Sequence, residues 1–161
     1  MKLIAISVSG EPSEPVINLP VAAREVGVAY KSLYEVAGYK SPWLGYFAIV
    51  DECCVGTCGF KSPPENNRVE IAYFTFPDYE GKGIATRMAK ALVTIAVDAD
   101  PRIEVAAQTL PIDSASTSIL RKLGFENTGT VIHPEDGEVW EWRYVPQSIQ
   151  PDGRAGGVPA G

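Results

Sequence analysis

Several features that mark common classes of protein are scarce or missing in this sequence. The chain has a single histidine, His133, and three cysteines, so it offers no ligand spacing typical of a zinc site. No apolar run approaches the roughly 20 residues that a transmembrane helix needs, and the first ten residues lack a signal-peptide pattern. We therefore expect a cytoplasmic protein that has no metal site and does not span a membrane.

Basic residues are also few. Lys and Arg together number 14 against 20 Asp and Glu, which gives a net charge of −6. Nucleic acids are bound mainly through Lys and Arg, so this balance argues against such a partner, whereas a cationic or neutral amine is electrostatically more welcome. The 161 residues, 45% of them hydrophobic, suit one compact domain, which we place at residues 1–145.

The cysteines and the histidine have simple structural explanations. Cys53, Cys54 and Cys58 lie close together in a strand-like region, and an odd number of thiols without a second cluster predicts free, buried thiols. These thiols lack an evident base, so we expect no covalent cysteine intermediate. His133 precedes Pro134 and is expected to be an exposed residue of a hairpin turn.

Hydrophobic periodicity predicts an alternation of strands and helices, hence an α/β protein with a mixed sheet flanked by helices. The expected strands cover residues 2–8, 45–50, 53–60, 68–76, 102–108, 124–132 and 138–145, and the expected helices cover 20–37, 83–98 and 113–123. The first helix has an apolar stripe formed by Ala22, Val26, Ala29, Leu33 and Val36. Residues 146–161 are rich in Gly and Pro and predict a flexible tail, with a docking role in an oligomer left open.

A glycine loop joins one of these strands to a helix. Gly81 and Gly83 permit a sharp turn and a close approach of the backbone to a ligand, and the first N–H groups of the following helix attract an anion. The pattern indicates a phosphate cradle, although a purely structural turn uses glycine equally well. It does not fit a nucleotide P-loop, because the earlier glycine and the Ser or Thr after the lysine are missing.

Three segments together resemble the GNAT N-acetyltransferase superfamily, in its RimJ/RimL-like branch, which modifies protein N-termini and small amines. They are the loop Glu80-Gly81-Lys82-Gly83-Ile84-Ala85, the segment Asp113-x-x-Ser116 with the later Leu123-Gly124-Phe125, and the strand Arg68-Val69-Glu70-Ile71-Ala72-Tyr73. The resemblance covers roughly residues 45 to 145. It implies a mixed, mostly antiparallel, twisted sheet of about six to seven strands flanked by helices.

The resemblance also implies that acetyl-CoA donates its acetyl group directly to a primary amine, either of a small molecule or of a peptide N-terminus. The pantetheine arm is then expected to pair with the backbone of residues 74–76, where an N–H group could stabilise the oxyanion. The implied cofactor-binding residues are Phe74, Thr75, Phe76, Gly81, Lys82, Gly83, Ile84, Ala85, Thr86, Asp113 and Ser116. Ser116 could also help to protonate the thiolate, and equally could be a surface serine that caps or packs.

The chain departs from the family pattern at two positions. Glu80 stands where the family usually has Gln or Arg, so we expect Glu80 to point to solvent while Lys82 and Arg87 partly compensate its charge. Leu120 stands where many relatives carry a tyrosine acid, which leaves the proton donor open.

Glu70 is the leading candidate for the general base. With a period of two it shares a strand face with Ala72, Phe74 and Phe76, and desolvation there would raise its pKa toward neutrality, which suits a base. The alternative is a salt bridge with Arg68 or Arg102, and Glu104 is the second candidate base.

The acceptor itself cannot be identified from the sequence. A pocket near its entrance could be lined by aromatic residues that are equally typical of a core, namely Tyr30, Tyr34, Tyr39 and Trp43. The oligomeric state, a homodimer included, is open. The alternative function is a catalytically silent acyl-CoA-binding or regulatory module.

Overall fold

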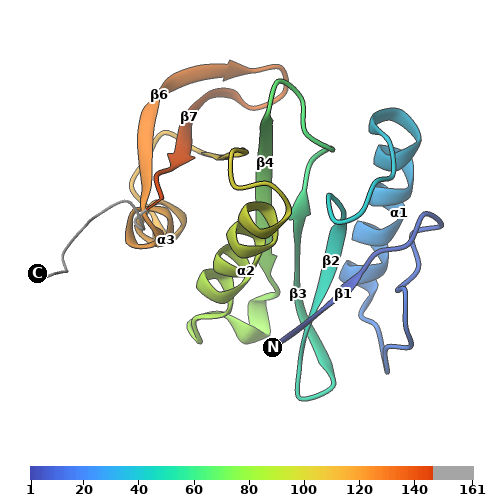
Figure 1. Cartoon of the computed structure of the whole chain (residues 1–161). Coiled ribbons are helices and arrows are strands. Elements are labelled where there is room, and N and C mark those ends of the chain that lie inside the picture. Colours follow the sequence, from blue (N-terminus) through green and yellow to red (C-terminus); the bar gives the residue numbers. More distant parts are fainter. Residues whose placement is uncertain (147–161) are drawn as a thin grey trace, which may run out of the picture. The chain divides into compact units, whose positions relative to one another are not determined.

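The computed structural model describes residues 1–146, so the expected tail at 146–161 lies almost entirely outside the described residues. The described part forms two compact units, Met1–Gln108 and the segment from Thr109 onward. Its seven strands are β1 (Lys2–Ala5), β2 (Gly45–Val50), β3 (Cys53–Phe60), β4 (Arg68–Thr75), β5 (Glu104–Thr109), β6 (Phe125–His133) and β7 (Gly137–Tyr144). Its helices are α1 (Val21–Ala37), α2 (Ile84–Ala99), α3 (Ala115–Leu123) and a short 3-10 helix, η1 (Pro77–Tyr79) (Figure 1).

The first unit is built on a sheet in which the strands follow the order β1-β2-β3-β4-β5. The pairs from β1 to β4 are antiparallel, and β5 runs parallel to β4 after the crossover through α2. Asp51 and Glu52, both with positive φ, form the turn of the β2–β3 hairpin, between the strands expected at 45–50 and 53–60. The sheet is therefore mixed and mostly antiparallel, which confirms the expected class of fold.

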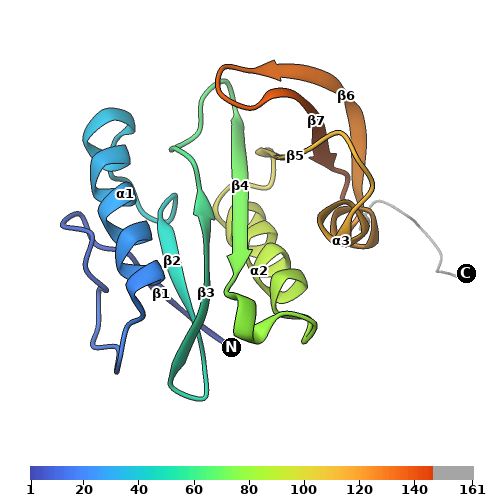
Figure 2. The ribbon, with the colours of Figure 1, turned by 180° about the vertical axis from the view of Figure 1, so that it is seen from behind.

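The two helices of this unit cover opposite faces of its sheet. α2 lies in front of β4 in Figure 1 and behind it in Figure 2, whereas α1 packs on β2 and β3 from the other side. Met88 and Leu92 of α2 are fully buried, and Val69 and Ile71 of β4 are each only 2% exposed. α2 thus packs through the aliphatic stripe that its periodicity predicts.

α1 packs through a different face from the one its aliphatic stripe predicts. Its buried residues are Ala23, Gly27 and Tyr34, while Val36 of the predicted stripe is 89% exposed. A Cβ on Gly27 would lie 2.3 Å from the carbonyl oxygen of Gly10, so the helix approaches the neighbouring loop closely at its small residues. The periodicity of aliphatic residues was misleading here because glycine and tyrosine make the contact.

Glycines in the sheet also make room for α1. A Cβ on Gly45 would lie 2.6 Å from the ring of Tyr30, and one on Gly59 would lie 2.4 Å from the Tyr30 hydroxyl. The tyrosine ring therefore lies directly on the backbone of β2 and β3. This fixes which strand residues face α1, because cross-strand partners share a face of the sheet.

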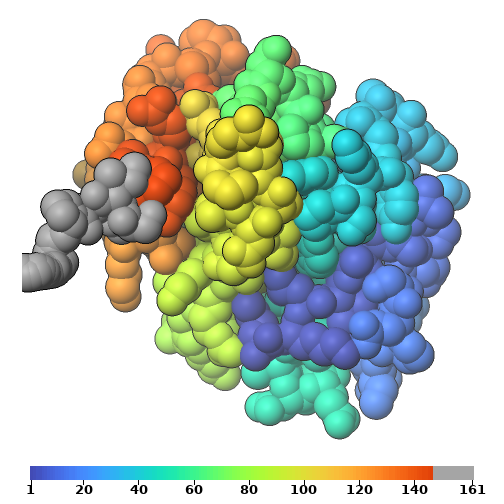
Figure 3. Space-filling view, in the orientation of Figure 1, coloured from blue at the N-terminus to red at the C-terminus, as the bar shows by residue number. Residues whose placement is uncertain are grey.

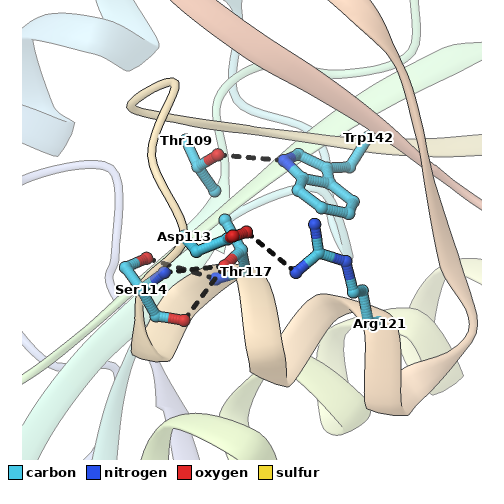
Figure 4. Close-up of polar contacts among 6 residues, drawn as sticks. All are labelled: Thr109, Asp113, Ser114, Thr117, Arg121 and Trp142. Atoms are coloured by element: carbon cyan, nitrogen blue, oxygen red, sulfur yellow. Dashed lines mark hydrogen bonds and ion pairs between the residues drawn. The ribbon is translucent and has the colours of Figure 1, made fainter.

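The second unit consists of α3 followed by the β6–β7 hairpin. The guanidinium carbon of Arg121 lies 5.1 Å from the centroid of the Trp142 ring, and the indole N–H of Trp142 donates to the Thr109 hydroxyl at 2.9 Å (Figure 4). Gly137, with φ of 75°, begins β7 after the hairpin turn. No helix within residues 1–146 is both long and apolar enough to cross a membrane.

Candidate functional site

The loop before α2 is open in front of its glycines. Gly81 and Gly83 have φ of 79° and 75°, the left-handed region that favours glycine, and a Cβ built on either would meet no atom within 4 Å. The backbone is turned as expected for a cradle, and the space in front of it is accessible. In Figure 3 the segment that holds the loop and the start of α2 lies at the molecular surface.

The N-terminus of α2 has no side-chain cap. Gly83 is the N-cap residue, and no side chain accepts a hydrogen bond from the first turn. The carbonyl of Gly83 accepts the N–H of Arg87, the first intrahelical bond. The N–H groups of the first turn are therefore directed outward without an intrahelical partner, which makes this helix end a ready site for an anion such as a pyrophosphate.

Charges around the loop fit the same role. Glu80 is exposed, as expected for a carboxylate that points to solvent, and Arg87 is exposed on the first turns of α2. The Lys82 ammonium lies 5.8 Å from the centroid of the Tyr79 ring. Lys82 lies in the loop immediately before α2 and Arg87 lies one turn into the helix, and the helix dipole adds to the positive potential at this helix end.

Strand β4 separates from β5 just before this loop. The parallel ladder pairs Arg68 with Glu104 and ends at Glu70 and Ala106, although β4 continues to Thr75. Beyond Glu70, the edge of β4 on this side has no strand partner among the residues of the first unit. A backbone edge of this kind can accept an extended chain as an additional strand.

Backbone hydrogen bonds show which residues of β4 address that open edge. The N–H of Lys61 donates to the carbonyl of Glu70 at 2.9 Å, and the N–H of Phe76 donates to the carbonyl of Val55 at 2.9 Å, both toward β3. Because successive residues of a strand direct their polar groups to opposite edges, Tyr73 and Thr75 address the open edge. The pairing of pantetheine through residues 74–76 stays a prediction; of these residues, Thr75 addresses the open edge, while the N–H of Phe76 is bonded to β3.

The side chain of Thr75 lies on one face of the sheet rather than at its edge. Its hydroxyl oxygen is buried and has no hydrogen-bond partner within residues 1–146. Buried polar groups are normally hydrogen-bonded, so this hydroxyl is an exception, and it lies on the α2 face of the sheet, where Gly56, the partner of Thr75, faces Met88. The neighbouring Phe74 is 55% exposed, whereas Phe76 is buried.

Glu70 is held in an ion pair, but not with the partners that the sequence suggested. Its Oε2 contacts the Lys61 ammonium, in a geometry that is not an aligned hydrogen bond, and the two side chains are 16% and 46% exposed. Arg68 instead pairs with Glu104 at 3.3 Å, and Arg102 pairs with Asp100 at 3.4 Å. Glu70 is therefore not isolated on an apolar face. Lys61 was missed because only the β3–β4 register brings it alongside.

The strand register places Glu70 on the face that α1 covers. Phe74 pairs with Thr57 and Ala72 pairs with Gly59, and Gly59 lies under the Tyr30 ring. Glu70 is separated from Ala72 and Phe74 by even numbers of residues, so these three side chains lie on the α1 side of β4. The shared face follows the predicted period of two, whereas its coverage by α1 was not predicted. Its role as base stays a prediction.

Helix α3 begins with a capping box rather than at Asp113. The Ser114 hydroxyl accepts the N–H of Thr117 at 3.4 Å, and the Thr117 hydroxyl accepts the N–H of Ser114 at 2.8 Å (Figure 4). Asp113 pairs with Arg121 at 3.1 Å. Ser116 is exposed on the first turn of α3 and is not the cap. Asp113 and Ser116 belong to the second unit, so their contacts with a cofactor bound at the loop stay a prediction.

Leu120 is fully buried in the second unit. Its side chain packs in the core and has no proton to donate to the CoA thiolate. Leu120, which stands where many relatives carry a tyrosine acid, is therefore a core residue and cannot act as a proton donor.

The three thiols are free, as expected, but Cys53 is exposed rather than buried, and His133 is only partly exposed in its hairpin. Cys54 and Cys58 are buried, and burial raises the pKa of Cys58 to about 12. Such a thiol stays protonated and is a poor nucleophile. His133 Nδ1 accepts the N–H groups of Glu135 and Asp136 in the β6–β7 turn, a structural role. Within residues 1–146 no three His, Cys, Asp or Glu side chains are grouped to hold a metal ion.

The aromatic residues near the expected acceptor entrance divide between core and surface. Tyr34 and Trp43 are buried, and the Tyr34 hydroxyl donates to the carbonyl of Ile6 at 2.9 Å. Tyr39 is exposed. Tyr30 lines a groove between α1 and the sheet.

A family model of the acetyltransferase (GNAT) domain matches residues 20–126, more than half of the chain. The chain belongs to the GNAT acetyltransferase family. This confirms the resemblance stated from the loop, the β4 strand and the α3 segment. No curated protein sequence matches the chain.

Solved structures agree with a GNAT fold. RimL, a ribosomal L7/L12 alpha-N-protein acetyltransferase in complex with coenzyme A, has a TM-score of 0.62 and 19% identity, covering 77% of this chain and 71% of that one. The aminoglycoside acetyltransferase AAC(6')-Ib in complex with coenzyme A has a TM-score of 0.58 and 20% identity, covering 75% and 78%. The ribosomal-protein-S5-alanine acetyltransferase from Vibrio fischeri has a TM-score of 0.57 and 18% identity, covering 67% and 64%. At these identities the likeness shows the fold alone.

Proposed function

We propose that this GNAT protein is a cytoplasmic acetyltransferase that transfers the acetyl group of acetyl-CoA directly to a primary amine. The observation that carries the proposal is the continuity of three features in one segment. The open backbone edge at Tyr73 and Thr75 leads through a glycine loop to the uncapped N-terminus of α2. A ligand with an extended arm that ends in a pyrophosphate matches this arrangement, because the arm can pair with the strand edge while the pyrophosphate lies at the helix N-terminus.

The residues of this segment fit the parts of acetyl-CoA. The N–H groups of the first turn of α2, with Lys82 and Arg87, would hold the pyrophosphate. The backbone of Tyr73 and Thr75 would bond the amide groups of the pantetheine arm. When bound, acetyl-CoA supplies an acyl group activated as a thioester.

Glu70 is the residue that we propose to take the proton from the acceptor. An alkylammonium has a pKa near 10.4, so the amine must lose a proton before its nitrogen can attack a carbonyl carbon. The carboxylate is mostly buried on the α1 side of β4, and Lys61 keeps it in place. The new C–N bond forms as the C–S bond breaks, and the sulfur leaves as a thiolate. Because an ordinary thiol has a pKa near 8.5, the thiolate needs no strong acid to leave, which suits a chain with Leu120 in place of tyrosine.

Substitution of Glu70 tests this role. Glu70→Gln keeps the shape but cannot take a proton, so kcat/KM should fall by roughly 10²- to 10⁴-fold, the usual contribution of general-base catalysis. CoA affinity measured by calorimetry should change little, and the acidic limb of the pH–rate profile should disappear. Glu104→Gln on the adjoining strand is the matched control. If Glu104→Gln loses activity while Glu70→Gln retains both rate and pH profile, the base is Glu104.

One observation favours a second candidate, a catalytically silent acyl-CoA-binding module. Glu70 is already engaged by Lys61, as in a purely structural ion pair. A screen of amines that measures the free thiol of CoA separates the two functions. An enzyme releases CoA in an amine-dependent manner, whereas a binding module binds acetyl-CoA and releases none.

A further inference from the structure

A groove of about 200 Å³ lies between α1 and the face of β3 and β4 that carries Glu70. Val26 and Tyr30 line it from the helix, and Thr57, Ala72 and Phe74 line it from the strands. All of these residues belong to the first unit. Tyr30 itself fills the space over Gly59, and the small side chain of Ala72, the strand partner of Gly59, lies at the floor of the groove beside it.

The groove is apolar and carries no charge. None of its lining residues in the described part of the chain is a carboxylate or a cation. The Tyr30 hydroxyl donates to the carbonyl of Phe60 at 3.2 Å, and burial raises the pKa of this phenol, so the side chain stays neutral. The exposed face of Phe74 provides the second aromatic wall.

The nearest carboxylate along β4 is Glu70, and its charge is balanced by Lys61. An acceptor with several ammonium groups would find one carboxylate here, already paired, and would leave its other charges against apolar walls. Burying an unpaired charge is strongly unfavourable. The site therefore disfavours polycations.

Size narrows the acceptor further. The groove has the volume of about seven molecules of liquid water, which is less than the roughly 300 to 1,000 Å³ of pockets for larger ligands. Side chains two residues apart on a strand are about 7 Å apart along it, which separates Glu70 from Ala72. A single aromatic ring in the groove, joined by a short linker to an amine near Glu70, fits this spacing.

We propose that the acetyl acceptor is a small primary monoamine with an aromatic group, which lies in the groove between Tyr30 and Phe74 while its amine addresses Glu70. The inference rests on the proposed acetyltransferase function and specifies its substrate class. Two flat aromatic walls favour a ring through edge-to-face or offset contacts.

The test compares four acceptors at fixed acetyl-CoA: phenethylamine, ethylamine, spermidine and a short peptide with a free N-terminus. Release of the CoA thiol gives kcat/KM for each. Phenethylamine should exceed ethylamine by roughly 10- to 100-fold, the effect of burying an apolar ring, and should exceed spermidine and the peptide as well. Equal rates for phenethylamine and ethylamine would overturn the proposal.

A filled groove should abolish this preference. Ala72→Leu places a branched side chain in the groove, so the ratio of kcat/KM for phenethylamine to that for ethylamine should fall by at least about 10-fold. Ala72→Val is the smaller substitution should the leucine variant not fold. Ala29→Leu makes the same change on the exposed side of α1 and should leave the ratio as in the wild type. A ratio that is unchanged in a folded Ala72 variant would show that the ring does not lie here.

The outcomes separate this inference from the function on which it rests. Rapid acetylation of spermidine or of the peptide, with phenethylamine inert, would overturn the substrate class and leave the acetyltransferase intact. Binding of acetyl-CoA without acetylation of any of the four amines, or of a wider amine panel, would overturn the enzymatic function and with it the proposed acceptor.

Discussion

Substitution of Gly83 gives the sharpest test of the CoA site. The residue has φ of 75°, where a side chain costs roughly 1–2 kcal/mol, partly offset by the lower entropy of the unfolded chain. No atom lies within 4 Å of an added Cβ, so no clash adds to this penalty. Gly83→Ala should therefore lower the free energy of unfolding by about 1 kcal/mol, and the melting temperature by about 2–4 °C.

The effect on CoA should depend on charge more than on this strain. In Gly83→Glu the carboxylate can occupy the space in front of the helix N-terminus that we assign to the pyrophosphate. Two like charges about 4–8 Å apart at a protein surface repel by about 2–4 kcal/mol, so the CoA Kd should rise by at least about 30-fold. Gly83→Ala adds only a methyl group and should raise the Kd less.

Gly137 provides the matched control. It has the same φ of 75°, and a Cβ there also meets nothing within 4 Å, but it begins β7 in the second unit, away from the glycine loop in sequence. Gly137→Ala and Gly137→Glu should show the same loss of stability with wild-type CoA affinity. Calorimetry with CoA measures the Kd, and thermal unfolding measures the stability. A folded Gly83→Glu protein that binds CoA as tightly as the wild type would refute the assignment of the loop.

Two further predictions follow from the buried thiols and phenols. Iodoacetamide at mild pH should add one carbamidomethyl group to the native protein, at the exposed Cys53. The Cys53→Ser variant should keep sequential steady-state kinetics. An acetylated cysteine, or parallel lines in double-reciprocal plots, would contradict direct transfer. Burial raises the pKa of Cys58, Tyr46 and Tyr73 to about 12 from ordinary values of 9.0 and 10.0, so the folded state keeps protons that the unfolded chain releases. The contribution of these groups to the free energy of unfolding is complete below about pH 9 and is lost as pH rises toward 12, by up to about 1.4 kcal/mol per pH unit for each group. Urea unfolding across this pH range measures the loss. A midpoint urea concentration that does not change with pH would contradict the prediction.

Much of the sheet could be predicted because local signals agree with the fold. β2 and β3 have the predicted bounds, since Asp51 and Glu52 mark their turn and both strands are nearly continuous runs of buried residues. The α1 helix was also predicted, but its buried face was not. Aliphatic side chains give the periodic signal, whereas the close contact is made by Gly27 and Tyr30, whose role depends on glycines elsewhere in the sheet.

The candidate site was predicted where it depends on local backbone and missed where it depends on pairing. The glycine loop and the helix start are contiguous, so the sequence contains them whole. Lys61 contacts Glu70 only because β3 and β4 run antiparallel in one register, and that register is a tertiary property. That Tyr73 and Thr75 direct their backbone groups to the same edge of β4 could have been predicted, because backbone N–H and C=O groups also alternate with a period of two along a strand. Capping was left open as one role of Ser116, whereas the N-cap is Ser114, two residues earlier, because the helix begins at Ala115 rather than at Asp113.

The alternation along β4 allows donor and acceptor recognition to vary independently. Ala72 and Phe74 contribute side chains to the groove beside α1, whereas Tyr73 and Thr75 address the edge that we assign to acetyl-CoA. Substitutions at Ala72 and Phe74 can therefore change which amine binds in the groove, while Tyr73 and Thr75 keep the backbone edge for acetyl-CoA. An insertion or deletion of one residue in this strand would exchange the two sets, so new specificities can arise in this chain by replacement but not by a change in strand length.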